Sequence, residues 1–434
     1  MQPAHINDAS STPVTSGELH PAQQLKVLLS AYSCAPNLGS EPGVGWHSVM
    51  QTARLHEVWV LTAAEQRAAI EREMAIRPLP NVHWVFVEVP SWLIFWKKGE
   101  RGRRIHYMLW QYWAYRAGKQ LHQEIKFDII HHVTFVSYWT PSYLAMLDAP
   151  FVWGPVGGGD GTPPAFYPIL SPDSRNNELL RDVVRAIAHH VDPFVGVTAR
   201  RSAIALPTTL ETSNKIRSLG APNIRIQHEC ALSTGDIANL SKVQVREDST
   251  PFSLLSMGRL LGWKGYYLGI HAFAELLKTH PHSEYWLVGD GPERPRLEAM
   301  AQDLGISANV HFTGTIPRTE TLRYLEHAHV LLHPSLHDTG SWVCLEAMAA
   351  GRPIVCLRRG GLTTLIDDAT GFRVSADKPQ QTIHDLAQAL ATIADDQDLR
   401  LRMGVAARER VNEHFSWDAK SKQFDKIYRE VVKV

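Results

Sequence analysis

The chain has 434 residues, of which 44% are hydrophobic and 20% are charged. This length predicts two domains, and the apolar content excludes a disordered or fibrous chain. Lysine plus arginine equals aspartate plus glutamate at 44 each, so no basic excess indicates a protein that binds nucleic acid. Four scattered cysteines with no CxxC pair argue against a disulfide framework or a thiolate zinc site and favour the cytoplasm.

Residues 1–24 are rich in Ser, Thr, Pro, Ala and Gln, and the first lysine or arginine is Lys26. This composition predicts a flexible tail and lacks the pattern of a signal peptide. No apolar stretch approaches the ~18 residues that span a bilayer. We therefore expect a cytoplasmic protein that is, at most, peripheral on the inner face of the membrane.

From Leu25 onward, short β-rich runs alternate with helix-length segments. Strands are predicted at Leu25–Ala31, Glu57–Thr62, Val82–Val89, Asp128–His132 and Phe151–Trp153. A glycine-rich stretch, APNLGSEPGVGW at residues 35–46, joins the first strand to a helix expected near Trp46–Arg54. Such alternation predicts a parallel sheet covered by helices on both faces.

Residues 90–119 combine aromatic and basic side chains to an unusual degree. Aromatic rings beside a basic cluster suit the headgroup zone of an anionic membrane. The alternative is a core helix whose aromatic residues pack inward beside a solvated basic loop. The residues expected to contact a membrane are Trp92, Trp96, Lys97, Lys98, Arg101, Arg103 and Arg104.

The strand predicted at Asp128–His132 ends in two histidines. Successive strand residues face opposite sides, so His131 and His132 cannot both point into a cleft at the strand end. Either one could instead be a hydrogen-bonded core histidine. Most of the other histidines, of 22 in all, are interpreted as solvated surface.

The second half repeats the alternating pattern after a polar, aperiodic region near residues 229–251, where we place the domain boundary. Strands are predicted at Phe252–Met257, Tyr285–Val288, Val310–Thr313, Val330–His333 and Pro353–Leu357, followed by an amphipathic helix over Thr382–Ile393. The predicted organisation is an amino-terminal domain at 25–230, a carboxy-terminal domain at 231–415, and a final helix at 416–434 that packs back on the first domain. Ligands in such sheets bind at the carboxyl ends of the strands.

Residues that could bind a ligand or take part in catalysis follow three strand ends in this second domain. The strand ending at Gly258 is followed by Arg259 and Lys264, two cations that can neutralise a diphosphate, although such residues are commonly surface charges. The strand ending at Val288 runs into Gly289 and Gly291, which permit a tight turn or close approach of a ligand.

The third strand end is followed by the largest number of candidate site residues. After the strand that ends near His333, a loop carries Asp338, and a helix holds Glu346 in its first turns. The free N–H groups of Gly340, Ser341, Trp342 and Val343 would point at an anion. The alternative is that Asp338 only caps the helix and Glu346 complements its dipole.

Together, the segments SMGRLLGWKG, WLVGDGPERPRLE, VHFTGTIPRTE and HPSLHDTGSWVCLEAMAAGRPIVC resemble the retaining family-4 glycosyltransferases of GT-B fold. The resemblance covers about residues 252–375 and is patchier before them. It implies an α/β GT-B fold in which two Rossmann-like doubly wound domains face a central cleft. It also implies transfer of a sugar from a nucleoside diphosphate-sugar to a glycan or lipid-linked acceptor, with retention at the anomeric carbon.

The resemblance also implies roles for individual residues. Positions matching Arg259 and Lys264 bind the diphosphate, the one matching Glu346 holds the ribose, and the one matching Asp338, usually Glu, contacts the donor sugar. Likeness to the family's diphosphate-facing loop places Gly43 and Gly45 near the cleft, with a plain strand–helix turn as the alternative. The family keeps a histidine facing the reacting sugar where His131 and His132 stand.

No DxD metal motif falls at a predicted strand end, so no metal or other cofactor is expected. Two other classes remain as alternatives. A GT-B-fold sugar-nucleotide epimerase would bind a similar donor without an acceptor. A non-catalytic nucleotide-sugar-binding module would keep the fold without transfer, and the Asp at position 338 is the feature in its favour.

Overall fold

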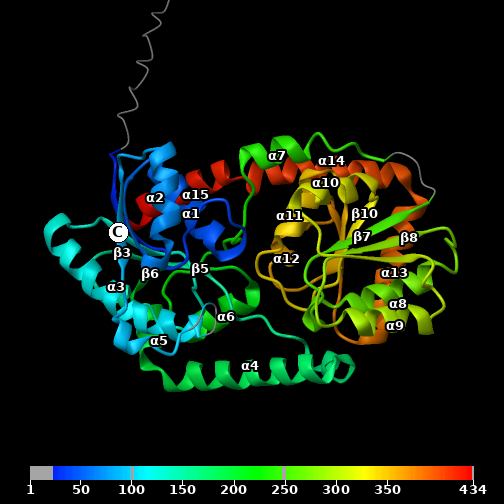
Figure 1. Ribbon diagram of the computed structural model, residues 1–434, viewed down its shortest axis with the longest axis horizontal. Coiled ribbons are helices and arrows are strands. Elements are labelled where there is room, and N and C mark those ends of the chain that lie inside the picture. The colour runs from blue at the N-terminus through cyan, green and yellow to red at the C-terminus, as the bar shows by residue number, and fades with distance from the viewer. Residues whose placement is uncertain (1–22, 98, 100–101, 247–250, 433–434) are drawn as a thin grey trace, which may run out of the picture.

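The computed structural model describes residues 23–97, 99, 102–246 and 251–432 (Figure 1). The predicted flexible tail therefore lies almost entirely outside the described residues, as do Lys98 and Arg101 of the expected membrane contact. Each half of the chain forms one sheet with helices on both faces, and the two halves stand side by side (Figure 1). Among the described residues, no helix is both long and apolar enough to cross a membrane.

The first sheet has six parallel strands in the order β3-β2-β1-β4-β5-β6. Its central strand is an apolar run because helices cover both faces of a parallel sheet, and Leu28 and Leu29 are fully buried on opposite faces. The strand at Ser202–Pro207 was not predicted. The strands are β1 (Lys26–Ser30), β2 (Glu57–Ala63), β3 (Val82–Val87), β4 (Ile129–His132), β5 (Phe151–Val156) and β6 (Ser202–Pro207).

Helices and short turns connect these strands. The first helix begins at Ser40, six residues before the predicted start, so half of the glycine-rich stretch is helical. The helices are α1 (Ser40–Ala53), α2 (Arg67–Ile76), α3 (Arg103–Ile125), α4 (Pro172–Val191), α5 (Pro193–Arg201) and α6 (Leu210–Ser218), with 3-10 turns η1 (Ala64–Gln66), η2 (Ser91–Leu93), η3 (Tyr143–Met146) and η4 (Pro164–Ile169).

The second sheet also has six parallel strands, in the order β12-β11-β10-β7-β8-β9. The predicted strands are all present, and the unpredicted β12 closes one edge. The strands are β7 (Ser253–Met257), β8 (Glu284–Val288), β9 (Val310–Gly314), β10 (Val330–His333), β11 (Ile354–Leu357) and β12 (Gly371–Val374). The helices are α7 (Thr234–Leu240), α8 (Tyr266–Leu276), α9 (Arg294–Asp303), α10 (Arg318–His327), α11 (Trp342–Ala349), α12 (Leu362–Leu365), α13 (Pro379–Asp395) and α14 (Gln397–His414), with the turn η5 (Gly262–Lys264). Two parallel α/β sheets with flanking helices confirm the predicted fold class.

The chain crosses between the domains twice at one place. Leu232 on the outward crossing accepts from Trp417 N–H and donates to the Phe415 carbonyl on the return crossing, both at 2.9 Å. The final helix α15 (Trp417–Val432) then packs on α1. Phe424, Ile427 and Tyr428 enter the core of the first domain, so that core is built from both ends of the chain.

The 20-residue helix α4 lies along the lower edge of Figure 1 and reaches from the first domain to the second. Its Ser174 hydroxyl donates to Glu293 at the start of α9, at 2.9 Å. Its Arg185 donates to the Asp160 carbonyl of the first domain at 2.6 Å. This helix therefore connects the two domains on the side away from the double crossing.

Candidate active site

The loop between β10 and α11 forms the centre of the candidate site. Ser341 precedes α11 with a φ of 31°, an unusual left-handed conformation for a residue other than glycine. This turn directs the N–H groups of Gly340 and Ser341 at Asp338 Oδ1, at 3.3 and 3.1 Å. An anion therefore does lie at the start of the helix, and it is the chain's own carboxylate.

Asp338 is also paired with a cation. Its Oδ2 lies 2.5 Å from Lys264 Nζ and 2.9 Å from His333 Nε2. Burial opposes ionisation of this carboxyl group, but Lys264 and His333 hold the pKa of Asp338 well below its usual range. The side chains of Lys264 and Asp338 are only 17% and 10% exposed, so this ion pair is poorly screened by water.

The glycines at the ends of β7 and β8 allow the two strand ends to approach closely. Gly258 and Gly289 have φ values of 137° and 136°. A Cβ on Gly289 would stand 2.1 Å from the Gly258 carbonyl oxygen, and one on Gly291 would stand 2.4 Å from the Leu260 carbonyl oxygen. Arg259 follows Gly258 with an exposed side chain, so it is free to turn toward a ligand at these strand ends.

Gly43 and Gly45 lie inside α1, and neither has a positive φ. The residues therefore belong to the first helix, neither to a diphosphate-facing loop nor to a plain strand–helix turn. A Cβ on Gly43 would stand 2.2 Å from the Leu38 carbonyl oxygen and 3.2 Å from the Trp342 ring, so this glycine lets α1 meet the start of α11 across the domain boundary. Gly45 is buried against Ser33, which gives it a packing role within the first domain.

His131 does not face the cleft. Its Nδ1 pairs with the Tyr428 hydroxyl and its Nε2 with the Gly154 carbonyl, both at 2.6 Å. The side chain is fully buried, and burial lowers the pKa of His131 to about 4. The assignment of His131 to the reacting sugar is therefore wrong, because both ring nitrogens are used to attach α15 to the sheet.

His132 lies on the opposite face of β4 and is also buried. Its Nε2 is 3.1 Å from the Tyr107 hydroxyl of α3. Burial, with a smaller contribution from His131, lowers the pKa of His132 to about 3, so its ring is neutral. Of the two histidines, His132 is the one that lies on the side of Tyr107 and away from α15.

Two carboxyl groups that sequence reasoning missed meet near the loop at Asp338. Glu41 in the first turn of α1 accepts from the Phe135 N–H at 3.1 Å. Burial and the nearby Glu229 raise the pKa of Glu41 to about 8. Burial also raises the pKa of Glu229, although Lys420 and a hydrogen bond from Thr339 oppose this. The acidic residue within GSEPGVG was a signal for Glu41, whereas nothing in the sequence around Glu229 pointed to a site.

The remaining predicted donor-site residues lie along α11. Trp342 is partly buried and donates its indole N–H to the Ala231 carbonyl at 3.0 Å, at the outward crossing. Val343 and Glu346 are partly buried on the same helix. The structure thus brings Lys264, Asp338, Gly340 and Ser341 together in direct contact, with Arg259 and Glu346 on the adjoining strand end and helix.

Residues 90–119 divide between the surface and the core. Trp92 and Phe95 are 71% and 83% exposed, whereas Trp110 is fully buried. Trp96 donates to the Leu93 carbonyl at 2.7 Å, and Lys97 is paired with Glu65. Arg103 is partly buried, and Arg104 lies over the Trp139 ring at 5.7 Å. The core interpretation therefore holds for Trp110, whereas Trp92 and Phe95 before α3, and Tyr112 on α3 at 49%, are exposed.

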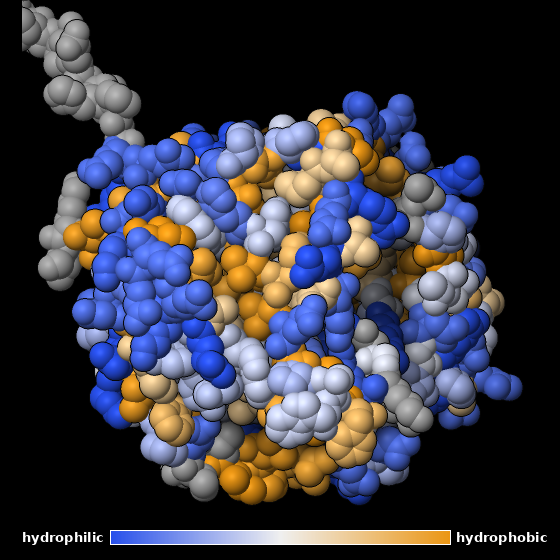
Figure 2. Space-filling view, turned by 60° about the vertical axis from the view of Figure 1, so that its left-hand side comes forward, coloured by the Kyte–Doolittle hydropathy of each residue, from blue (hydrophilic) through white to orange (hydrophobic). Residues whose placement is uncertain are grey.

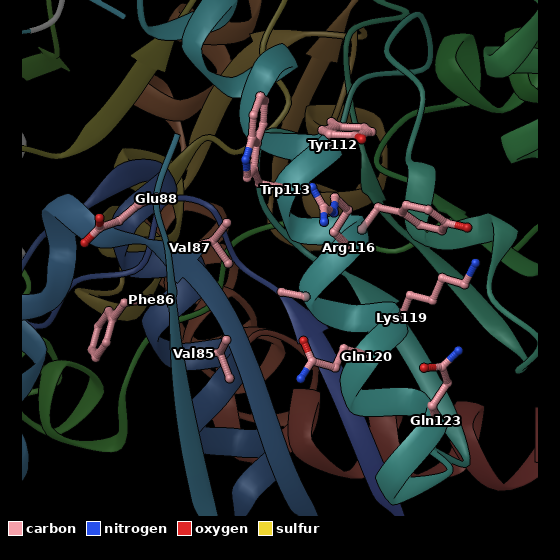
Figure 3. A pocket seen from close by; sticks show the side chains of 12 residues that line it. Val85, Phe86, Val87, Glu88, Tyr112, Trp113, Arg116, Lys119, Gln120 and Gln123 are labelled. Atoms are coloured by element: carbon pink, nitrogen blue, oxygen red, sulfur yellow. The ribbon is translucent and has the colours of Figure 1, made fainter. Parts of the chain in front are cut away.

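A cavity of about 600 Å³ lies between the edge strand β3 and α3 (Figure 3). Val85 and Val87 line it from β3, and Tyr112, Arg116 and Lys119 line it from α3 (Figure 3). Its lining combines apolar side chains with the cationic Arg116 and Lys119 and the acidic Glu88 (Figure 3).

Comparison with known proteins identifies the class. Residues 239–410 match the family model of glycosyl transferases group 1. The match covers most of the second domain and less than half of the chain, and it supports the resemblance to glycosyltransferases that the motifs indicated. The whole chain has the GT-B fold.

Curated relatives resemble the chain over this domain. A D-inositol 3-phosphate glycosyltransferase of Corynebacterium kroppenstedtii is 32% identical over 185 residues, 41% of this chain and 40% of the relative. A glycogen synthase of Mycobacterium tuberculosis is 30% identical over 184 residues, 42% of this chain and 44% of the relative. The matched region thus spans less than half of each of these relatives.

Solved structures resemble the chain over nearly its full length. The Anabaena protein HepE in complex with UDP and glucose has a TM-score of 0.56 at 18% identity, covering 94% of this chain and 100% of that one. The lipopolysaccharide outer core galactosyltransferase WaaB has a TM-score of 0.61 at 14% identity, with the same coverage. At these identities the likeness establishes the fold.

Proposed function

We propose that the protein transfers a sugar from a nucleoside diphosphate-sugar to a hydroxyl acceptor, with retention at the anomeric carbon. The observation that carries the proposal is the anion position at the start of α11. There the N–H groups of Gly340 and Ser341 and the Lys264 ammonium converge on one carboxylate, that of Asp338. A diphosphate oxygen has the charge and acceptor geometry to take the place of that carboxylate. The binding of UDP by HepE supports this class of donor.

The leaving diphosphate would be stabilised by groups already in place. Lys264 and the backbone N–H groups at the start of α11 supply positive charge in a largely buried position, where preorganised donors act strongly on developing charge. Arg259, which is exposed, would turn toward the diphosphate from the adjoining strand end. Glu346, further along the same helix, would bind the ribose hydroxyls. We propose that transfer needs no metal, because these groups neutralise the diphosphate.

We propose the following transfer step for this site. The bond between the anomeric carbon and the diphosphate breaks, the acceptor oxygen bonds to the same face of that carbon, and a diphosphate oxygen takes the acceptor proton. We assign His132 to the side of the reacting sugar. Glu41, protonated at neutral pH because its pKa is raised to about 8, would donate a hydrogen bond there. Trapping of a covalent glycosyl-enzyme adduct would refute this mechanism.

The acceptor is proposed to be a glycan or lipid-linked sugar in the synthesis of a surface polysaccharide or glycolipid. The cavity between β3 and α3 offers apolar walls and the cations Arg116 and Lys119, which suit a lipid-linked phosphate. The exposed Trp92 and Phe95 nearby favour contact with a membrane surface.

Calorimetric titration with UDP, GDP and ADP tests the donor site. We expect selective binding of one nucleotide, weakened roughly tenfold to a hundredfold in Arg259→Ala and Lys264→Ala variants, because each removes a charge-assisted hydrogen bond. Lys278→Ala, at an exposed lysine just after α8, is the matched control and should bind as the wild type does. Equal binding by the control and both site variants would overturn the assignment.

A further inference from the structure

Helix α4 exposes a continuous apolar face to solvent. Five aliphatic side chains on this face are between 44% and 63% exposed: Leu179, Leu180, Val183, Val184 and Ile187. The charged residues within the same stretch, Arg181, Asp182 and Arg185, are partly buried. Figure 2 shows apolar side chains gathered on the underside of the molecule, the edge along which α4 runs in Figure 1.

The opposite face of α4 is fixed to both domains by polar contacts. Arg181 donates to His337 Nε2 at 2.8 Å, and the Glu178 carboxylate lies 3.3 Å from the same nitrogen. Glu178 also accepts from Thr162 of the first domain at 2.7 Å. His337 stacks on Trp263 at 4.5 Å and directly precedes Asp338. The apolar face therefore cannot turn inward without breaking these contacts, and its exposure is a fixed property of the fold.

Basic and aromatic groups flank this apolar face. α5 follows α4 after one residue and exposes Phe194, Arg200 and Arg201. The start of α3 exposes Ile105 and Arg104. The loop at residues 157–161 lies between it and α4. Arg104 lies over Trp139, a Cβ on Gly158 would stand 3.1 Å from the Trp139 indole nitrogen, and Arg185 of α4 donates to the Asp160 carbonyl. Exposed arginines thus lie on the elements next to α4, while Asp182, with a side chain 44% exposed, is the acidic residue beside its apolar strip.

We infer that the outer face of α4 docks on the surface of a bilayer that contains anionic phospholipid. An uncharged aliphatic helix face bordered by cationic and aromatic side chains is the pattern of helices that lie in the membrane interface. A second copy of the chain, paired face to face, would bring the same arginines opposite one another and oppose its own binding.

Docking through α4 goes beyond the proposed transfer reaction and does not depend on the identity of the donor. It adds a second membrane contact to the aromatic segment before α3. Because α4 also holds His337 beside the anion position, the bound membrane and the donor site would share one rigid helix.

Co-sedimentation with vesicles of phosphatidylcholine, with and without phosphatidylglycerol, tests the inference. The wild type should bind, and more strongly when phosphatidylglycerol is present. A Leu180→Asp/Val183→Asp variant should bind at least about tenfold more weakly, because two charges replace aliphatic groups that would enter the interface. Val405→Asp on α14 is the matched control, since Val405 is 57% exposed on a helix elsewhere, and it should bind like the wild type.

Arg200→Glu/Arg201→Glu should weaken binding only to vesicles that contain phosphatidylglycerol. Nucleotide titration of each variant tests whether the fold and the donor site are intact. Loss of vesicle binding together with normal nucleotide binding would therefore support docking through α4. Unchanged vesicle binding by Leu180→Asp/Val183→Asp would overturn the inference, and so would a wild type that does not bind vesicles. A dimer seen by light scattering and dissociated by the α4 variant, without vesicle binding, would assign the face to a second copy.

Discussion

Removing Lys264 should leave the Asp338 carboxylate buried without its cation. At a separation of 2.5 Å and an effective dielectric constant near 20, the pair interacts by roughly 7 kcal/mol before desolvation is subtracted. Breaking one side of a pair this buried costs about 3 kcal/mol or more in the free energy of unfolding. We therefore expect Lys264→Met to lower that free energy by about 3 kcal/mol, measured by urea unfolding with two optical probes.

Asp338→Asn provides the matched control for this reasoning. Asparagine keeps the shape and can still accept from the helix N–H groups, so Lys264→Met/Asp338→Asn should recover most of the loss. A double-mutant cycle over the four proteins should give a coupling energy of about 2 kcal/mol. A coupling below about 0.5 kcal/mol would refute the claim that Lys264 stabilises the buried carboxylate.

The same substitution separates binding from transfer. Because Asp338 occupies the position proposed for a diphosphate oxygen, Asp338→Asn should bind UDP more tightly, by roughly tenfold. Transfer from the sugar nucleotide should fall, because the carboxylate is proposed to contact the donor sugar. Weaker UDP binding in this variant would show that Asp338 does not compete for the anion position.

Three further predictions concern the first domain. In the unfolded chain His131 takes up a proton below about pH 6.5, whereas in the folded protein it does so only near pH 4. The free energy of unfolding should therefore fall by up to about 3 kcal/mol as the pH is lowered through this window. His131→Phe should flatten this dependence in acid-unfolding curves. Tyr428→Phe should destabilise the fold by about 1 kcal/mol, seen by thermal unfolding, with nucleotide affinity unchanged. In a pH–rate profile, the transfer rate of the wild type should fall above about pH 8, where Glu41 loses its proton. Glu41→Gln should transfer sugar normally near pH 7 and should not show this fall. Identical profiles for the two proteins would exclude Glu41 as a hydrogen-bond donor.

The sequence pattern predicted ten of the twelve strands because each is a compact apolar run in a chain with strong alternation. It missed β6, since Ser202–Pro207 follows α5 with no turn residue between them. It also missed β12, a four-residue edge strand that contains an arginine. The amphipathic pattern of α4 is present in the sequence, but periodicity reports only that a helix has an apolar face and not whether the fold covers it.

The candidate site was predictable where its residues share a local motif. Lys264, Asp338 and Gly340 follow strand ends of one sheet, and parallel strands bring such ends together. Glu41 and Glu229 meet only through the tertiary fold, and so no local signal joined them. The sequence showed that only one of His131 and His132 can face a cleft, but it did not show which one. The partner that fixes His131 is Tyr428, which lies 297 residues later in the chain.

Burial of polar groups was the property least visible in the sequence. Most histidines outside the pair on β4 were expected to be solvated surface, but five of them are buried: His56, His106, His228, His329 and His333. His56, His106 and His329 have partners from distant segments, as His329 does when it accepts from the Ser253 N–H at 2.9 Å. His228 and His333 have partners two and five residues away. Histidine composition alone does not carry that information.

The packing of α15 on the first sheet has a consequence for how the protein is made. A ribosome completes all six strands of the first sheet early, yet Phe424, Ile427 and Tyr428, which fill its core, are synthesised after the whole second domain. Until they emerge, the nascent first domain exposes the apolar surfaces of β1 and β4 that they will cover. The two domains therefore cannot complete their folding strictly in the order of translation, because the core of the first domain is filled only after the second domain has been synthesised.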